Sequence, residues 1–184
     1  MIVYAVVALP FALPVLPVEQ FVRYERLLGL APRAEERNPV AELPQYYADQ
    51  FGWEEMVATI ADAYKRLTPQ EQSECVLYVR NYGEAGAIDF YGSRHGLPKA
   101  TCGHNNYWIW GPGTRTGNIA IIIGVSNDLQ RSFADLRRGY TSVEHFGTTN
   151  AKYAMPFENG RPIFVCKGMN TTFQKLWPGE RFYI

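Results

Sequence analysis

The sequence predicts an α/β layered sandwich, in which helices flank a largely parallel, mixed sheet of the Rossmann-like kind. Residues 118–124, NIAIIIG, form a continuous run of β-branched apolar residues, typical of a strand buried on both faces. Residues 53–67 carry apolar side chains at spacings of three and four, which indicates a helix that packs on a sheet. Strand-like and helical segments alternate around these two elements, as in other α/β folds.

The remaining elements follow from local signals along the chain. A capping box at 68–71 precedes the first strand, and Gly96 can end a helix over 84–95. The segment 126–128, Ser-Asn-Asp, caps a helix that carries Leu129 and Phe133. The expected strands are 75–80, 99–102, 118–124, 141–146 and 162–166. Residues 45–184 are therefore predicted to form one soluble α/β domain.

The first eighteen residues, MIVYAVVALPFALPVLPV, contain no charged side chain. Three prolines within this stretch exclude one uninterrupted helix, because each removes a backbone donor. We expect residues 1–17 to be the end of a truncated membrane helix followed by the segment that leaves the bilayer. A buried or interfacial extended arm is the alternative. Residues 18–44 are expected to be a juxtamembrane amphipathic helix and a charged, proline-containing linker.

Composition and motifs exclude several classes of function. The 184-residue chain balances 18 basic against 18 acidic residues without a basic cluster, so nucleic acid is not an expected partner. Cys75, Cys102 and Cys166 lie far apart and form no metal-ligand spacing, so neither a metal nor a cofactor is expected. No Ser/His/Asp nucleophile pattern and no HExxH motif occur, and we assign no catalytic residue.

The stretch NYGEAGAIDFYG, residues 81–92, raises the question of phosphate binding. A glycine turn that opens a helix offers free amides to an anion. Here the glycines give only G-x-x-G, and Glu84 places a carboxylate where the anion would lie. The sequence favours a tight strand-to-helix turn, with a phosphate site as the alternative.

The glycine-bounded loop CGHNNYWIWGPG, residues 102–113, concentrates an imidazole, amides and aromatic rings. Such groups suit the apolar faces and hydroxyl edges of sugars; equally, the two tryptophans can fill the core while the asparagines cap turns. Segments 81–86, 103–110 and 124–128 should meet beyond the carboxyl ends of the strands. The candidate substrate-binding residues are Asn81, Tyr82, Glu84, His104, Asn105, Tyr107, Trp108, Trp110 and Asn127.

Five segments together resemble the C-terminal soluble region of bacterial family 39 type glycosyltransferases, which are related to dolichyl-phosphate-mannose-protein mannosyltransferases. They are LPQYYADQFGWEEMV (43–57), NYGEAGAIDFYG (81–92), GHNNYWIWGPG (103–113), YAMPFEN (153–159) and IFVCKG (163–168). The segment 8–19 also resembles the point where the last membrane helix of that family ends and its extracytoplasmic domain begins.

The resemblance implies a bacterial membrane enzyme that transfers a sugar from a polyprenyl-phosphate donor outside the cytoplasm, with inversion. The catalytic acidic residue of that family lies in an early loop between membrane helices, which nothing in this chain matches. The chain is therefore expected to be a non-catalytic accessory domain at the extracytoplasmic face of the cell membrane. Its implied partners are the membrane-embedded remainder of the same polypeptide, and a polyprenyl-phosphate sugar or a glycan or protein acceptor.

Two alternatives remain open at the level of sequence. The chain can be a structural or partner-binding domain without a ligand. It can also be a free-standing small α/β enzyme, in which Glu84 and His104 act as acid and base.

Overall fold

The computed structural model describes residues 2–30, 41–124 and 126–183, so most of the predicted linker, residues 31–40, lies outside the described residues. Within that part of the chain, five strands form one sheet in the order β2-β1-β3-β5-β4. The strands are β1 (Val76–Val79), β2 (Ala100–Cys102), β3 (Ile119–Ile123), β4 (Tyr140–Thr148) and β5 (Pro162–Met169). The predicted α/β layered fold is confirmed.

The directions of the strands make the sheet mixed but largely parallel. Strand β1 pairs in parallel with both β2 and β3. Strand β5 is antiparallel to both β3 and β4, so β4 points the same way as the first three strands. The sequence did not predict that β5 would insert antiparallel between β3 and β4.

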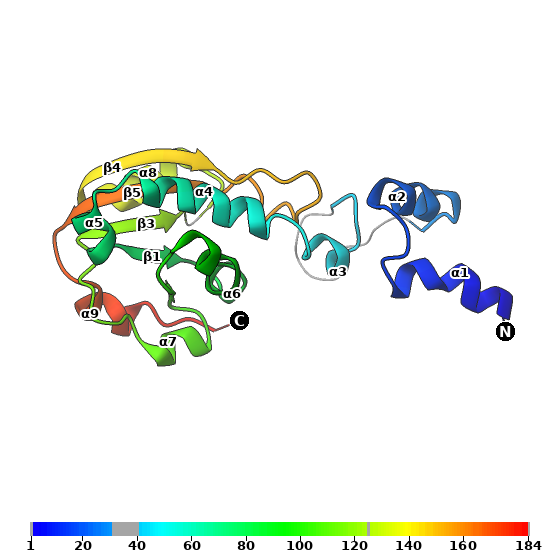
Figure 1. Cartoon of the computed structure of the whole chain (residues 1–184), viewed down its shortest axis with the longest axis horizontal. Helices are drawn as coiled ribbons and strands as arrows, with labels where there is room; N and C mark the ends of the chain where they lie inside the picture. Colours follow the sequence, from blue (N-terminus) through cyan, green and yellow to red (C-terminus); the bar gives the residue numbers. More distant parts are fainter. Residues whose placement is uncertain (1, 31–40, 125, 184) are drawn as a thin grey trace.

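The helices surround the sheet and extend beyond it on one side (Figure 1). They are α1 (Ile2–Ala12), α2 (Val18–Leu27), α3 (Gln45–Ala48), α4 (Trp53–Lys65), α5 (Pro69–Glu74), α6 (Tyr82–Tyr91), α7 (Asn106–Trp110), α8 (Leu129–Arg137) and α9 (Phe173–Leu176). Two 3₁₀ turns, Gly92–His95 and Trp177–Gly179, follow α6 and α9. The helix predicted over 84–95 is therefore α6 followed by a 3₁₀ turn, which Gly96 caps. Helix α7 forms within a segment that was predicted to be a loop.

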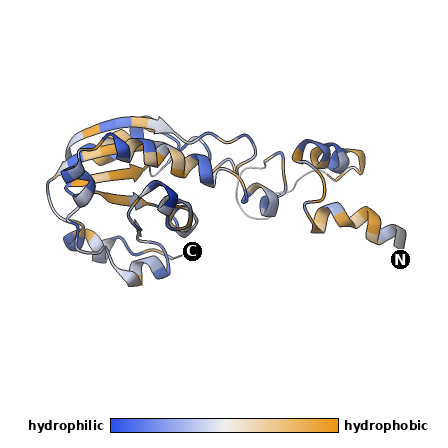
Figure 2. Ribbon diagram, in the orientation of Figure 1, coloured by the Kyte–Doolittle hydropathy of each residue, from blue (hydrophilic) through white to orange (hydrophobic). Residues whose placement is uncertain are grey.

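Helices α4 and α6 cover one face of the sheet. The apolar stripe of α4, which includes Val57 and Ile60, packs with Ile88 of α6 against Leu77 and Ile121 of the central strands. The other face packs against α8, α9 and the 3₁₀ turn at Trp177, through residues that include Phe164 of β5. Because both faces are covered, strands β1 and β3 are buried along their whole length and are mostly apolar, as the orange strands of Figure 2 show.

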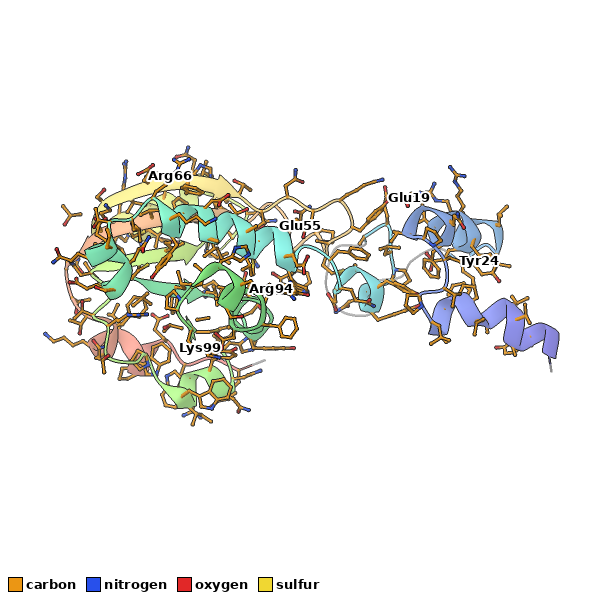
Figure 3. The ribbon with its side chains drawn as sticks, in the orientation of Figure 1. Glu19, Tyr24, Glu55, Arg66, Arg94 and Lys99 are labelled. Atoms are coloured by element: carbon orange, nitrogen blue, oxygen red, sulfur yellow. The ribbon has the colours of Figure 1, made fainter. Side chains whose placement is uncertain are left out.

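The N-terminal helices form a separate small cluster beside α3. Phe21 and Val22 of α2 pack with Tyr47 of α3 and with Met155, which precedes β5. The Tyr24 hydroxyl, labelled in Figure 3, donates to the Val7 carbonyl oxygen over 2.7 Å and ties α2 to α1. The cluster therefore holds the first helices against the loop that leads into β5.

Helix α1 itself exposes apolar side chains. Tyr4 and Val6 are 79% and 65% exposed, and the helix lacks charged residues at either end. Pro10 lies inside the helix. The helix continues past this proline and ends at Ala12. None of the described helices has the length and apolar character needed to cross a bilayer.

Candidate functional site

The turn after β1 is a capping box, in which Asn81 and Glu84 pair with the free backbone N–H groups at the start of α6. The Asn81 Oδ1 atom accepts the Glu84 backbone N–H over 2.9 Å. The Glu84 Oε2 atom accepts the backbone N–H groups of Arg80 and Asn81 over 2.8 and 3.2 Å. The Glu84 carboxylate thus occupies the position at the start of α6 where a phosphate would bind. This geometry is that of the tight strand-to-helix turn which the sequence favoured.

A second carboxyl group, that of Glu158, lies beside this turn. The Asn81 side-chain amide donates to Glu158 Oε1 over 2.9 Å. Burial, together with the neighbouring Glu84 charge, raises the pKa of Glu158 to about 7. Burial also raises the pKa of Glu84, against the opposing effect of two backbone N–H groups and the Arg161 charge. The pair therefore holds a proton up to near-neutral pH.

His104 follows β2 and lies close to the same turn, but it is fully buried. The Tyr82 backbone N–H donates to His104 Nδ1 over 3.4 Å, and the Phe182 ring stacks on the imidazole at 4.2 Å between centroids. Burial lowers the pKa of His104, so the ring is neutral at pH 7. Among the described residues, no hydrogen bond joins Glu84 to His104, and Glu84 Oε1 and His104 Nε2 each lack a partner.

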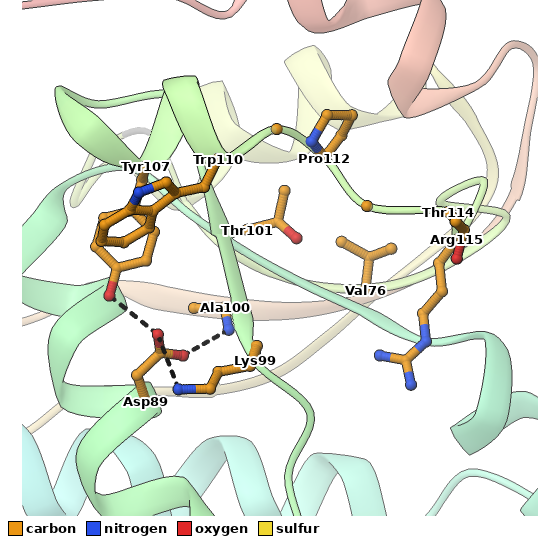
Figure 4. Close-up of a pocket in the computed structure, with 12 residues that line it drawn as sticks. Val76, Asp89, Lys99, Ala100, Thr101, Tyr107, Trp110, Pro112, Thr114 and Arg115 are labelled. Atoms are coloured by element: carbon orange, nitrogen blue, oxygen red, sulfur yellow. Dashed lines mark hydrogen bonds and ion pairs between the residues drawn. The ribbon is translucent and has the colours of Figure 1, made fainter.

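An open pocket of about 630 Å³ lies elsewhere, along the outer edge of β2 near the amino ends of β1 and β2 (Figure 4). Its lining comes from β1, α6, β2 and the residue before it, α7 and the segment after α7: Val76, Asp89, Lys99, Ala100, Thr101, Tyr107, Trp110, Gly111, Pro112, Gly113, Thr114 and Arg115. Tyr107 and Trp110 of the predicted site lie here, and not beyond the carboxyl ends of the strands where we expected them.

A hydrogen-bond network fixes the polar side of the pocket. Asp89 Oδ1 accepts the Ala100 backbone N–H over 2.9 Å, and Asp89 Oδ2 accepts the Tyr107 hydroxyl over 3.1 Å. The Lys99 ammonium lies 3.6 Å from the same carboxylate. Burial and the Asp89 charge raise the pKa of Tyr107 to about 12, so its hydroxyl remains protonated at neutral pH.

The aromatic side of the pocket is formed by one face of α7. The Tyr107 and Trp110 rings meet edge to face, with their centroids 4.7 Å apart. Trp110 is 69% exposed, so its ring is available to a ligand. Figure 4 shows both rings on one side of the pocket, with Arg115 on the opposite side. An exposed aromatic ring suits stacking against the apolar face of a sugar.

The side chains of Trp108 and Asn127 have structural partners. The Trp108 indole N–H donates to the Trp177 carbonyl oxygen over 2.9 Å, and the Trp177 indole N–H returns a bond of 3.0 Å to the Trp108 carbonyl oxygen. The Asn127 amide donates to the carbonyl oxygens of Pro156 and Asn159. Asn105 precedes α7 with a φ of 52° and makes no capping bond through its side chain. The two tryptophans therefore have different roles. Trp108 packs against the core, whereas Trp110 is exposed and can contact a ligand.

Asp89, Arg115 and Glu158 were not predicted as site residues, although the sequence carries partial signals for them. Asp89 is the one charged residue in the apolar helical stretch 85–91, which marks it for a specific contact. Arg115 and Glu158 lie in glycine- and proline-rich loops whose destinations depend on the tertiary fold. Among the described residues, no group of three His, Cys, Asp or Glu side chains is arranged to hold a metal ion.

The fold and site together define an α/β domain that carries an aromatic and polar pocket at the edge of its sheet. Comparison of the chain with models of protein families, with curated proteins and with solved structures finds no match.

Proposed function

We propose that this chain is the extracytoplasmic accessory domain of a bacterial membrane glycosyltransferase of the family 39 type, and that it binds saccharide without catalysing transfer. The observation that carries the proposal is the pocket that the exposed Trp110 ring shares with a hydrogen-bonded set of polar groups around Asp89. Saccharides need both features, because their rings present apolar C–H faces and hydroxyl edges. In the whole enzyme this pocket would contact the sugar of the polyprenyl-phosphate donor or a glycan acceptor.

Helix α1 supports a position next to the membrane. Its exposed residues Tyr4, Val6 and Leu9 are apolar, and the first charged residue of the chain is Glu19. A helix that is apolar all round suits surroundings that are apolar on every side, as lipid and neighbouring membrane helices are. On this proposal α1 joins the domain to the membrane-embedded remainder of the polypeptide.

The alternative of a free-standing enzyme that uses Glu84 and His104 has less support. Both side chains are fully buried, and each is held by a backbone contact at the start of α6. A substrate would have to displace Tyr82 or Phe182 to reach the imidazole.

The test is a titration of the ¹⁵N-labelled 184-residue chain in detergent micelles with mannose and mannobiose, followed by NMR. We expect shifts at the amides of 99–101 and 107–115, and affinity at least tenfold lower for Trp110→Ala, equivalent to about 1.4 kcal/mol. Ile109→Ala is the matched control, since Ile109 is an exposed apolar residue of the same helix outside the pocket lining. A spectrum that stays unchanged up to the solubility of the sugar would contradict saccharide binding and favour the structural alternative.

A further inference from the structure

The charges around the pocket favour one kind of saccharide. Asp89 is the acidic residue of the lining, whereas Lys99 and Arg115 are basic. The Asp89 carboxylate is already satisfied by the Ala100 N–H, the Tyr107 hydroxyl and the Lys99 ammonium, at 2.9, 3.1 and 3.6 Å. One positive charge of the lining is therefore left without a counter-charge inside the pocket.

That charge is carried by Arg115. Its Nε atom donates to the Ser73 carbonyl oxygen over 3.0 Å, which fixes the position of the guanidinium with a neutral partner. In the described part of the chain, the ion pairs do not include Arg115. A guanidinium held by one neutral acceptor retains further donors, whose geometry matches a carboxylate or a phosphate.

The arrangement separates this charge from the aromatic rings. Figure 4 shows Tyr107 and Trp110 on one side of the pocket, Arg115 on the other, and Val76 and Thr101 between them. At about 630 Å³, the pocket has room for a sugar ring and its substituent together.

We propose that the ligand of this pocket is an anionic saccharide, whose carboxylate or phosphate pairs with Arg115 while its ring stacks on Trp110. This inference rests on the proposed saccharide binding and narrows it to sugars that carry a negative charge. Lys99 has a different part: it balances Asp89 and leaves Arg115 to bind the ligand.

The experiment compares two matched pairs of sugars on the full chain by NMR titration: glucuronate against glucose, and mannose 6-phosphate against mannose. We expect the charged member of at least one pair to bind at least tenfold more tightly. This advantage should fall as salt is raised from 20 to 300 mM, because it is electrostatic. The pair with the larger advantage identifies the group as a carboxylate or a phosphate. Uridine diphosphate serves as a comparator, and tighter binding of this nucleotide than of either acidic sugar would overturn the inference.

Variants of Arg115 test whether its guanidinium is the charge that binds the acidic sugar. Arg115→Gln should reduce the affinity for the acidic sugar to that of the neutral one, and Arg115→Lys should retain part of the advantage. Arg131→Gln is the control, since Arg131 is an exposed arginine on α8 outside the pocket lining. If Arg115→Gln unfolds, the paired affinities and salt dependence of the unaltered chain still decide the question.

The outcomes separate this inference from the proposed function. Equal affinities for charged and neutral sugars would overturn the anionic ligand and leave saccharide binding in place. An advantage that survives Arg115→Gln would overturn the role of Arg115. Failure of all four sugars to bind would overturn both proposals.

Discussion

The Asn81 side chain bridges two glutamates that lie far apart in the sequence. Its Oδ1 atom accepts the Glu84 backbone N–H over 2.9 Å, while its Nδ2 atom donates to Glu158 Oε1 over 2.9 Å, across a separation of 77 positions. One amide therefore fixes both the start of α6 and the loop that enters β5. This loop also includes Met155, which packs against the N-terminal helices.

The first prediction concerns the pH dependence of stability. The pKa of Glu158 is about 7 in the folded chain and near its ordinary value of 4.5 in the unfolded chain, so the folded state holds more protons between these values. The stabilising contribution of the protonated group is complete below pH 4.5 and is lost as the pH rises through about 7. We expect the free energy of unfolding to fall over this interval by on the order of 2 kcal/mol.

Urea unfolding of the unaltered chain and of Glu158→Gln between pH 4.5 and 8 checks this prediction. The variant keeps an acceptor for Asn81 and should be the more stable protein at pH 8, with a flatter profile. Glu144→Gln, an exposed change on β4, should leave the profile unchanged. Identical slopes for the unaltered chain and Glu158→Gln would refute the raised pKa.

The second prediction separates the two bonds of Asn81. Asn81→Ala removes the helix cap and leaves Glu158 without its donor, at a cost of about 2 kcal/mol. Asn81→Ser retains a capping oxygen but is too short to reach Glu158, so it should cost about half as much. Chemical denaturation at pH 6 measures both values. Equal losses for the two variants would mean that the bond to Glu158 contributes nothing.

The third prediction concerns the C-terminal segment that covers His104. The Phe182 N–H donates to the Gly103 carbonyl oxygen over 3.2 Å, so this segment runs against the residues that follow β2. A Cβ at Gly103 would overlap the Glu180 carbonyl oxygen, which belongs to the backbone and cannot rotate away. We expect Gly103→Ala to destabilise the fold by at least about 2 kcal/mol.

Thermal unfolding measures this effect, with Gly179→Ala as the matched control. A Cβ at Gly179 would meet no atom within 4 Å, so the control should change stability by less than about 0.5 kcal/mol. Hydrogen exchange of the Phe182 amide should also quicken in Gly103→Ala alone. Unaltered exchange would show that the segment docks without this close approach.

The fourth prediction tests the proposed role of α1. If α1 lies in an apolar membrane environment, the chain should co-sediment with phosphatidylcholine vesicles. Val6→Asp, at a 65% exposed position of α1, should lower the partition coefficient at least tenfold, because a carboxylate is costly to place in lipid. Gln130→Asp makes an acidic substitution on the remote helix α8 and should leave partition nearly unchanged. A chain that stays in the supernatant would contradict membrane attachment through α1.

The local elements could be predicted from the sequence because their signals lie within a few residues of one another. The apolar stripe of α4, the capping box at Thr68 and the β-branched run of β3 each specify an element in this way. The capping box at Asn81 is also a local signal, since Glu84 follows Asn81 by three positions. The α/β class follows from the order of such elements.

The candidate site depended on contacts that no local pattern contains. Its sequence-predicted residues divide between the turn at the start of α6, the core around Trp177, the loop that precedes β5 and an open pocket. Residues 107, 108 and 110 share one short helix, and the turn of the helix directs them to different surroundings.

The sequence by itself determined the class of fold, the principal helices and strands, and the strand-to-helix turn at Asn81, because backbone propensity and apolar periodicity act over short distances. Only the tertiary structure decided that β5 runs antiparallel between β3 and β4, that Glu158 meets Asn81, and that Asp89 and Arg115 line the same pocket as Trp110. These relationships arise when loops of little intrinsic structure are fixed by the packing of the sheet and its helices, which brings together residues that are distant in the chain.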